Sequence, residues 1–152
     1  MLDTNMLIGG QFVSGDGEAH PVVNARTGQV IANVNDATTV QVEAAVAAAQ
    51  KAFETWSRTT PAERAALLLK LADAIDKDAE AIAAVECLNT GKPRLRMLQD
   101  EMPVASDCFR YFAGAARTMH ALATGEYLTG YTSMIRRDPV GIVGSIAPWN
   151  YP

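Results

Sequence analysis

The sequence predicts a protein of the α/β class, because strand-like and helix-like patterns occupy separate stretches of the chain. Short apolar runs separated by glycine-containing turns fill residues 6–34. Apolar residues at helical spacing dominate residues 38–122, and strand-like runs return from residue 126 onward. A chain of 152 residues with 49% hydrophobic residues is sufficient for one globular domain.

Two β-hairpins are expected at the amino-terminal end. In MLIGGQFV (residues 6–13), two short apolar runs flank Gly9 and Gly10. A pair of glycines between strands favours a type I′ turn, because both central positions of that turn need a positive φ. The run PVVNARTGQVIANV (residues 21–34) repeats this arrangement around a turn at residues 24–28. The sequence therefore predicts four short strands in this region.

Helices are expected next, and each has a recognisable start. Thr38 and Gln41 can form a capping box, and apolar residues then recur at helical spacing up to Trp56. The sequence TPAE at residues 60–63 supplies a capping threonine, a proline at the first helical position and a glutamate at the third. One apolar stripe continues behind it, so we expect a single helix that ends at Gly91.

A third helix is predicted from about Leu95 to Leu122. Pro103 should kink or divide it, because proline has no backbone N–H to donate. Two strand-like runs follow, TSMIRRD (residues 132–138) and VGIVGSIA (residues 140–147). The second run has apolar residues on both faces, which predicts a strand that is covered on both sides.

Composition excludes several classes of function. A net charge of −4 argues against a nucleic-acid-binding face, which needs a basic surface. No apolar stretch is long enough to span a bilayer, and the first residues lack the features of a signal peptide. Two cysteines do not form a disulfide framework, so a reducing cytoplasm is the expected location.

The usual catalytic residue types are poorly placed. Cys87 falls in the last turns of a predicted helix, whose negative end disfavours a thiolate. Cys108 is next to Asp107, a carboxylate that also disfavours a thiolate. His20 and His120 have no partner at a metal-ligand spacing, so no metal site is expected. Nucleotide-binding glycine motifs are absent as well.

The segment SIAPWNYP (residues 145–152) is the strongest candidate for a functional site. It brings a tryptophan, an amide and a tyrosine to the end of an apolar run. One interpretation is a core strand that ends in a proline-flanked turn, with Trp149 as a packing residue. The other is that Asn150 is an oriented amide donor that stabilises an oxyanion. The residues alone leave both open.

A family resemblance favours the second interpretation. PVGIVGSIAPWNYP (residues 139–152) resembles the signature P-x-G-x-x-x-x-I-x-P-W-N-[FY]-P of the NAD(P)-dependent aldehyde dehydrogenases. Four other stretches resemble family motifs in the same order, namely LIGGQFV, VVNARTGQVIANV, ECLNTGKP and FRYFAGAAR. Within the family, the gamma-aminobutyraldehyde dehydrogenases are the members that this chain resembles most. The stretches concerned are FRYFAGAAR, GEYLTGYTSMIRRDPVGIVGSIAPWNYP and the amino-terminal hairpins.

The resemblance implies a domain organisation. Residues 1–126 are expected to be the amino-terminal part of a Rossmann-like NAD-binding domain, with β-hairpins and helices. Residues 127–138 are expected to start the oligomerisation sheet, and residues 139–152 to return as a strand that stops at the active site. We therefore expect the chain to be a fragment that is inactive alone. The complete protein is expected to be a homodimer or homotetramer.

The resemblance also implies a reaction and its residues. The family oxidises an aldehyde through a thiohemiacetal on a cysteine, passes a hydride to NAD and hydrolyses the thioester. Neither cysteine of this chain matches the nucleophile. Asn150 matches the catalytic amide that donates to the oxyanion. The residues implied along the nicotinamide cofactor are Ile146, Ala147, Pro148, Trp149 and Asn150. Those implied along the substrate channel are Glu101, Val104 and Tyr151.

The identity of the substrate leaves alternatives. Family members that act on aminoaldehydes often carry acids at the positions of Glu101 and Val104, and only Glu101 is acidic here. The resemblance to the gamma-aminobutyraldehyde dehydrogenases implies an aminoaldehyde such as 4-aminobutanal as the substrate, with betaine aldehyde or another aldehyde as the alternative. Asn89 replaces an aspartate near a structural cation site of some relatives, which weakens the case for a cation. A further alternative is a non-enzymatic interaction module derived from a truncated paralogue.

Overall fold

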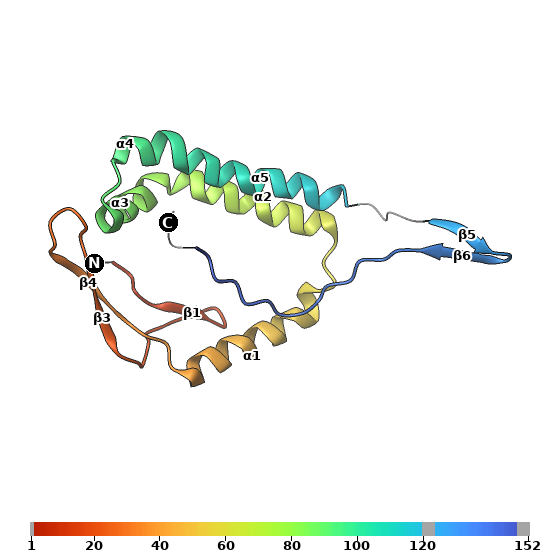
Figure 1. The fold of residues 1–152 in the computed structure, drawn as a ribbon, viewed down its shortest axis with the longest axis horizontal. Helices are drawn as coiled ribbons and strands as arrows, with labels where there is room; N and C mark the ends of the chain where they lie inside the picture. Colours follow the sequence, from red (N-terminus) through yellow and green to blue (C-terminus); the bar gives the residue numbers. More distant parts are fainter. Residues whose placement is uncertain (1, 120–123, 149–152) are drawn as a thin grey trace.

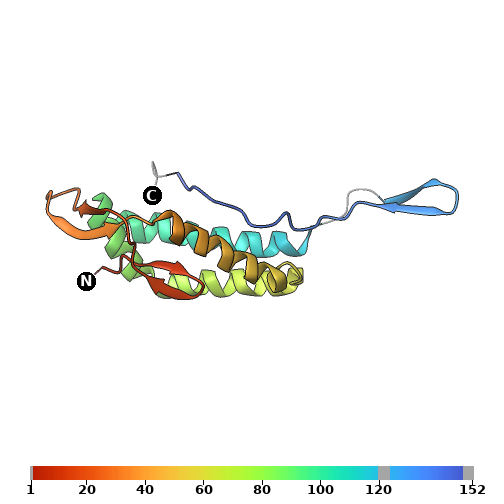
Figure 2. The same ribbon diagram turned by 90° about the horizontal axis from the view of Figure 1, so that it is seen from below.

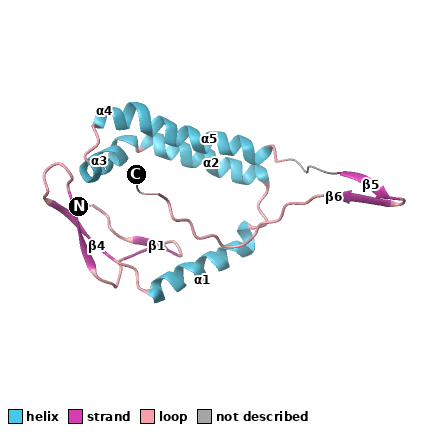
Figure 3. Ribbon diagram, in the orientation of Figure 1, coloured by secondary structure: helices cyan, strands magenta, loops and turns pink. Residues whose placement is uncertain are grey.

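The computed structural model of the chain describes residues 2–119 and 124–148. Helices α2 and α5 lie side by side in one layer, α1 lies apart from them, and the β5–β6 hairpin projects from one end (Figures 1 and 2). Strands occur only as hairpins among the described residues (Figure 3). The elements are β1 (Met6–Ile8), β2 (Gln11–Val13), β3 (Ala19–Val23), β4 (Val30–Asn35), α1 (Thr39–Trp56), α2 (Pro61–Lys77), α3 (Ala79–Thr90), α4 (Arg94–Arg96), the π-helical segment η1 (Met97–Glu101), α5 (Met102–Arg117), β5 (Thr124–Leu128) and β6 (Tyr131–Met134).

The two amino-terminal hairpins are confirmed. Strands β1 and β2 pair antiparallel, and Gly9 and Gly10 between them have φ values of 59° and 82°. These are the positive angles that the type I′ turn requires. In the β3–β4 hairpin, the Asn24 side chain accepts a hydrogen bond from the backbone N–H of Arg26 at 2.9 Å. That side-chain bond stabilises the turn locally.

The capping boxes that start α1 and α2 are also confirmed. In the first, the Gln41 side chain accepts from the N–H of Thr38 at 3.0 Å and from the N–H of Asp16 at 3.0 Å. The same amide donates to the carbonyl of Ser14 at 2.8 Å. Gln41 is buried, and its bonds with Ser14 and Asp16 connect the start of α1 to the segment that follows β2.

The sequence predicts a single helix from residue 61 to residue 90, and this prediction is wrong in one respect. The structure divides the helix at Asp78 into α2 and α3. This residue has φ −100° and ψ 12°, outside the helical range, and it ends α2 and begins α3. Aspartate is a weak helix former that favours helix ends. The apolar stripe is compatible with either arrangement, so periodicity could not predict the break.

Pro103 divides the third helix, as predicted. The N–H of Met102 donates to the carbonyl of Met97, five residues earlier, and residues 97–101 form a π-helical turn. Such a turn accommodates the proline ring, which crowds the carbonyl four residues before it.

The predicted end of this helix at Leu122 is wrong. Helix α5 ends at Arg117, where the N–H and hydroxyl of Thr118 both donate to the carbonyl of Ala115.

Helices α2 and α5 pack through small residues. Their buried positions include Ala65 and Ala72 on α2 and Ala113 on α5, which allows a close approach of the two backbones. At the surface of this pair, Arg110 of α5 donates to Asp73 and Asp76 of α2, each at 2.8 Å. Hydrogen bonds, first from Ser106 and then from Arg110, lower the pKa of the Asp76 carboxyl.

The strand predicted at residues 140–147 does not form. Residues 135–148 have no regular secondary structure, and the side chains of Val140 and Ile146 are 93% and 90% exposed. A strand requires a hydrogen-bonded neighbour, and no strand of the described residues lies against this segment. Ile142 and Val143 instead share a pocket of about 370 Å³ with residues of β1 and α1. The segment thus returns alongside α1 (Figure 1).

This exposed apolar segment leads to a prediction about the 152-residue chain in solution. We expect the purified chain to bind a hydrophobic dye and to elute as a mixture of sizes, because large exposed apolar patches promote association. Size-exclusion chromatography combined with dye fluorescence measures both. A single monodisperse species with a cooperative thermal transition and no dye binding would favour the autonomous interaction module instead.

No helix in residues 2–119 or 124–148 combines the length and the apolar character needed to cross a membrane.

Candidate functional site

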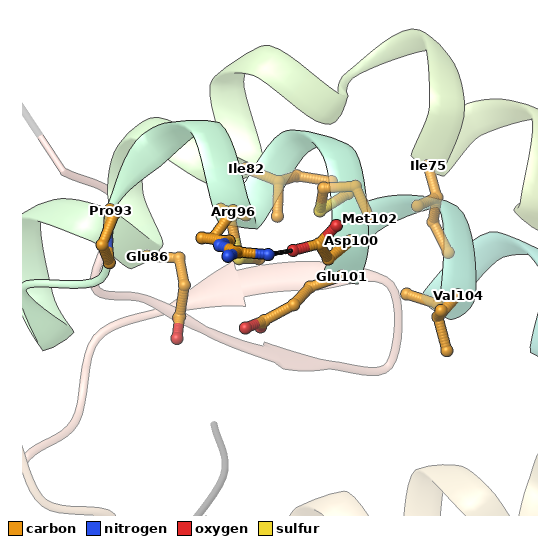
Figure 4. Close-up of a pocket in the computed structure, with 11 residues that line it drawn as sticks. Ile75, Ile82, Glu86, Pro93, Arg96, Asp100, Glu101, Met102 and Val104 are labelled. Atoms are coloured by element: carbon orange, nitrogen blue, oxygen red, sulfur yellow. Dashed lines mark hydrogen bonds and ion pairs between the residues drawn. The ribbon is translucent and has the colours of Figure 1, made fainter.

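A pocket of about 800 Å³ lies where α2 and α3 face the π-helical turn and the start of α5 (Figure 4). Its apolar part continues into a small core made by Ala83, Met97 and Met102. Charged side chains gather on one side of the pocket. The lining residues are Ile75, Ile82, Glu86, Pro93, Arg96, Met97, Asp100, Glu101, Met102, Val104 and Ala105.

A glycine turn brings the two sides of this pocket together. Gly91 ends α3 with φ 78°, a left-handed conformation that side chains other than glycine rarely adopt. A Cβ at this position would also lie 3.1 Å from the Cγ atom of Arg26. The chain then reverses through Pro93, so that the end of α3 faces η1. The side chain of Lys92, in the turn itself, reaches residues on both sides.

Three charged groups meet beside the pocket. The Lys92 Nζ atom lies 2.7 Å from Glu101 Oε2 and 3.5 Å from Glu86 Oε1. The side chains of the lysine and the two glutamates are 19%, 20% and 19% exposed, so solvent screens them only in part. The hydrogen bond with Glu101 is the largest cause of a raised pKa for Lys92. Two carboxylates and one ammonium give this group a formal charge of −1.

Glu86 is the less well satisfied of the two carboxylates. Among the described residues, its buried Oε1 atom has no hydrogen-bond partner, and Lys92 Nζ approaches it to 3.5 Å as an ion pair. A second ion pair on the pocket wall joins Arg96 and Asp100 at 2.9 Å (Figure 4). That pair has no net charge. The residual charge of −1 at the pocket therefore is the net charge of the group formed by Glu86, Lys92 and Glu101.

The predicted site residues fall into three sets. Glu101 and Val104 are brought together, because both line the pocket. Ile146, Ala147 and Pro148 are exposed on the segment 135–148 and are not among the residues lining that pocket. The remaining three, Trp149, Asn150 and Tyr151, lie outside the described residues.

The exposed segment is compatible with the cofactor role that the resemblance assigns to it. Within the described residues, the backbone groups of residues 146–148 are in no sheet, and the side chains are exposed. The contact of Ile146, Ala147 and Pro148 with the nicotinamide cofactor therefore stays a prediction from the family resemblance.

The cysteines are placed as the sequence suggested. Cys87 is half-buried on α3 and packs against the small core, whereas Cys108 is exposed on α5. Neither forms a disulfide. In the part of the chain that the structure describes, no three His, Cys, Asp or Glu side chains are arranged to hold a metal ion.

Sequence reasoning missed Lys92 and Glu86. Both belong to ECLNTGKP, a stretch that carries the family resemblance but whose pattern indicates no chemical role for either residue. The available signal was the presence of two opposite charges around the end of an otherwise apolar helix. That signal does not identify Glu101 as the third member, because its approach depends on the turn at Gly91 and on the π-helical turn.

These features define the amino-terminal part of an aldehyde dehydrogenase fold. The PnpE structure from Pseudomonas sp. WBC-3 is similar with a TM-score of 0.92 and 38% identity, over 99% of this chain and 31% of that one. An indole-3-acetaldehyde dehydrogenase in the apo form gives a TM-score of 0.92 at 26% identity, over 100% of this chain and 35% of the other. The α/β fold class predicted from the sequence is confirmed.

The sequence comparisons agree with the structural ones. The aldehyde dehydrogenase of Alternaria alternata is 40% identical over 98% of this chain and 30% of its own length. The mitochondrial benzaldehyde dehydrogenase of Antirrhinum majus is 36% identical over 97% of this chain and 28% of its own. The model of the aldehyde dehydrogenase family matches residues 12–152, so this chain belongs to the aldehyde dehydrogenase family. It spans about 30% of the length of these curated relatives.

Proposed function

We propose that this chain is the amino-terminal part of an NAD-dependent aldehyde dehydrogenase that oxidises an aldehyde to a carboxylic acid. The observation that carries the proposal is the family match, which extends through the signature at residues 139–152. A solved relative, PnpE, has been crystallised with nicotinamide adenine dinucleotide, which supports NAD as the cofactor. When bound, NAD supplies the acceptor for the hydride that leaves the substrate.

Each set of residues in this chain has a role in the proposed reaction. The side-chain amide of Asn150 donates a hydrogen bond to the aldehyde oxygen as that oxygen gains negative charge. Ile146, Ala147, Pro148 and Trp149 hold the nicotinamide ring and exclude water from it. Glu101, Val104 and Tyr151 line the route by which the aldehyde enters. The cysteine nucleophile of the family corresponds to neither Cys87 nor Cys108.

The proposal is tested by assaying the complete protein with a panel of aldehydes. NADH formation that requires both aldehyde and enzyme is the expected result, and NAD should be a better cofactor than NADP. A folded complete protein that forms NADH with no aldehyde of the panel would contradict the proposal.

A finer proposal is that the substrate carries one positive charge, as 4-aminobutanal does. The named relatives include generic and benzaldehyde dehydrogenases, so support for this step comes from the pocket rather than from them. Glu101 lines that pocket, and the charge of its group with Glu86 and Lys92 is −1. One residual negative charge in a partly desolvated pocket complements one ammonium group.

We expect Glu101→Gln to raise KM for 4-aminobutanal by about twofold to fivefold relative to KM for butanal. The expected change in KM is small because an ion pair that solvent partly screens contributes little binding free energy. Steady-state kinetics with both aldehydes, and with the matched exposed control Lys51→Gln, give the ratio directly. If both KM values rise equally, Glu101 supports the helix and does not recognise charge.

We also propose that the complete protein is a cytoplasmic homo-oligomer that assembles through the β5–β6 hairpin. The hairpin projects from the helical layer (Figure 1). Its exposed apolar side chains support this role, because such patches mark protein interfaces. They are Tyr127, Leu128, Tyr131 and Met134. The two free cysteines are consistent with a reducing compartment.

A further inference from the structure

Lys92 occupies an unusual position beside the pocket. Its ammonium group lies between carboxylates from two different elements, Glu86 on α3 and Glu101 at the end of η1. Both glutamates line the pocket, whereas Lys92 is not among the lining residues. A charged group that contacts pocket-lining carboxylates, without lining the pocket itself, can change the charge of the pocket without touching a ligand.

The two approaches of Lys92 are unequal. Lys92 donates a 2.7 Å hydrogen bond to the Glu101 carboxylate, whereas its approach to Glu86 Oε1 is a longer ion pair of 3.5 Å, and that oxygen has no hydrogen bond among the described residues. With the lysine in place, the three groups carry a formal charge of −1, and without it the two carboxylates carry −2. Because these side chains are only about one-fifth exposed, this difference in charge changes the electrostatic potential inside the pocket.

The backbone makes Glu101 depend on this contact. Glu101 is the last residue of a π-helical turn, whose hydrogen-bond pattern is less regular than that of an α-helix. On the opposite side, Lys92 follows the left-handed glycine that ends α3. The ion pair therefore connects two irregular segments, and it fixes the direction in which the Glu101 side chain points.

We propose that Lys92 is a positioning residue that sets the charge preference of the pocket, by holding Glu101 and cancelling one of two negative charges. This inference rests on the proposed function, because the pocket must be the route of an aldehyde. With Lys92, the pocket suits a neutral or singly charged aldehyde. Without it, the pocket favours cationic aldehydes more strongly.

The test is Lys92→Met in the complete protein, with 4-aminobutanal and butanal as substrates at about pH 8. We expect the ratio of kcat/KM for the charged aldehyde over the neutral one to rise by about threefold to tenfold, chiefly through KM. Lys92→Arg keeps the positive charge and should restore the ratio of the unmodified protein. Lys51→Met, an exposed lysine of α1, is the matched control and should leave the ratio unchanged.

Three outcomes would overturn the inference. The first is an unchanged ratio in folded Lys92→Met, and the second is an equal loss for both aldehydes, which indicates a structural role alone. The third is failure of Lys92→Arg to restore the ratio. If Lys92→Met does not fold, Lys92→Gln replaces it in the same comparison.

If the proposed function is wrong, the result differs from all three of these outcomes. In that case the unmodified protein oxidises no aldehyde of either charge. Thermal unfolding of Lys92→Met, Glu101→Gln and the double variant then tests the link between the two residues. Additive changes in stability would overturn the positioning role, whereas a coupled response would support it.

Discussion

Asn150→Ala in the complete protein is expected to lower kcat by about 10²–10³-fold, the usual effect of losing one oxyanion donor. The aldehyde oxygen gains negative charge when the nucleophile attacks, and the amide N–H of Asn150 is proposed to stabilise that charge. Because the charge is small in the bound aldehyde, KM should change much less than kcat. Steady-state kinetics with saturating NAD measure both parameters.

Two controls separate this role from a packing role. Asn33→Ala removes an exposed amide on β4 and should leave kcat unchanged. Thermal unfolding should show that Asn150→Ala is folded, since one amide contributes little to packing. A folded Asn150→Ala protein with normal kcat would remove Asn150 from the mechanism and favour the interpretation of SIAPWNYP as a structural turn.

The elements that could be predicted from the sequence are those whose causes are local. The type I′ turn needs only Gly9 and Gly10, and the start of α1 needs only Thr38 and Gln41. Pro103 likewise acts on the turn immediately before it. In each case the backbone groups that must be satisfied lie within a few residues, so a short pattern contains the full cause.

The segment VGIVGSIA shows why the remainder could not be predicted in this way. Its apolar residues predict a strand, but a strand forms only when neighbours supply hydrogen bonds along its edges. Among the described residues it has none, and Val140 is 93% exposed. The pattern describes the environment that the segment needs, whereas its conformation depends on whether that environment is present.

The contact between Lys92 and Glu101 beside the pocket could not be predicted from the sequence for a different reason. Lys92 and Glu101 are nine residues apart, a spacing that neither helix nor strand periodicity brings together. Their contact depends on a left-handed glycine, a chain reversal and a π-helical turn acting in succession. Glu101 itself could be selected from the family resemblance, but the partner that limits its charge is visible only in three dimensions.

The 152-residue chain assayed alone is expected to show no aldehyde-dependent NADH formation. The reaction that the family resemblance implies needs a cysteine nucleophile, an activated water and an oxyanion donor acting together. Removing groups that act as a unit leaves little of the rate enhancement. Cys87 is half-buried in the packing of α3, and Cys108 is exposed beside Asp107 without a base in hydrogen-bond contact among the described residues.

The decisive measurement compares the purified chain with Cys87→Ser and Cys108→Ser, each at high protein concentration with NAD and a panel of aldehydes. We expect all three to match the rate without protein. A turnover that the chain supports and that one serine variant abolishes would make that cysteine a nucleophile. This region would then perform the chemistry itself, beyond the substrate and cofactor contacts proposed for it.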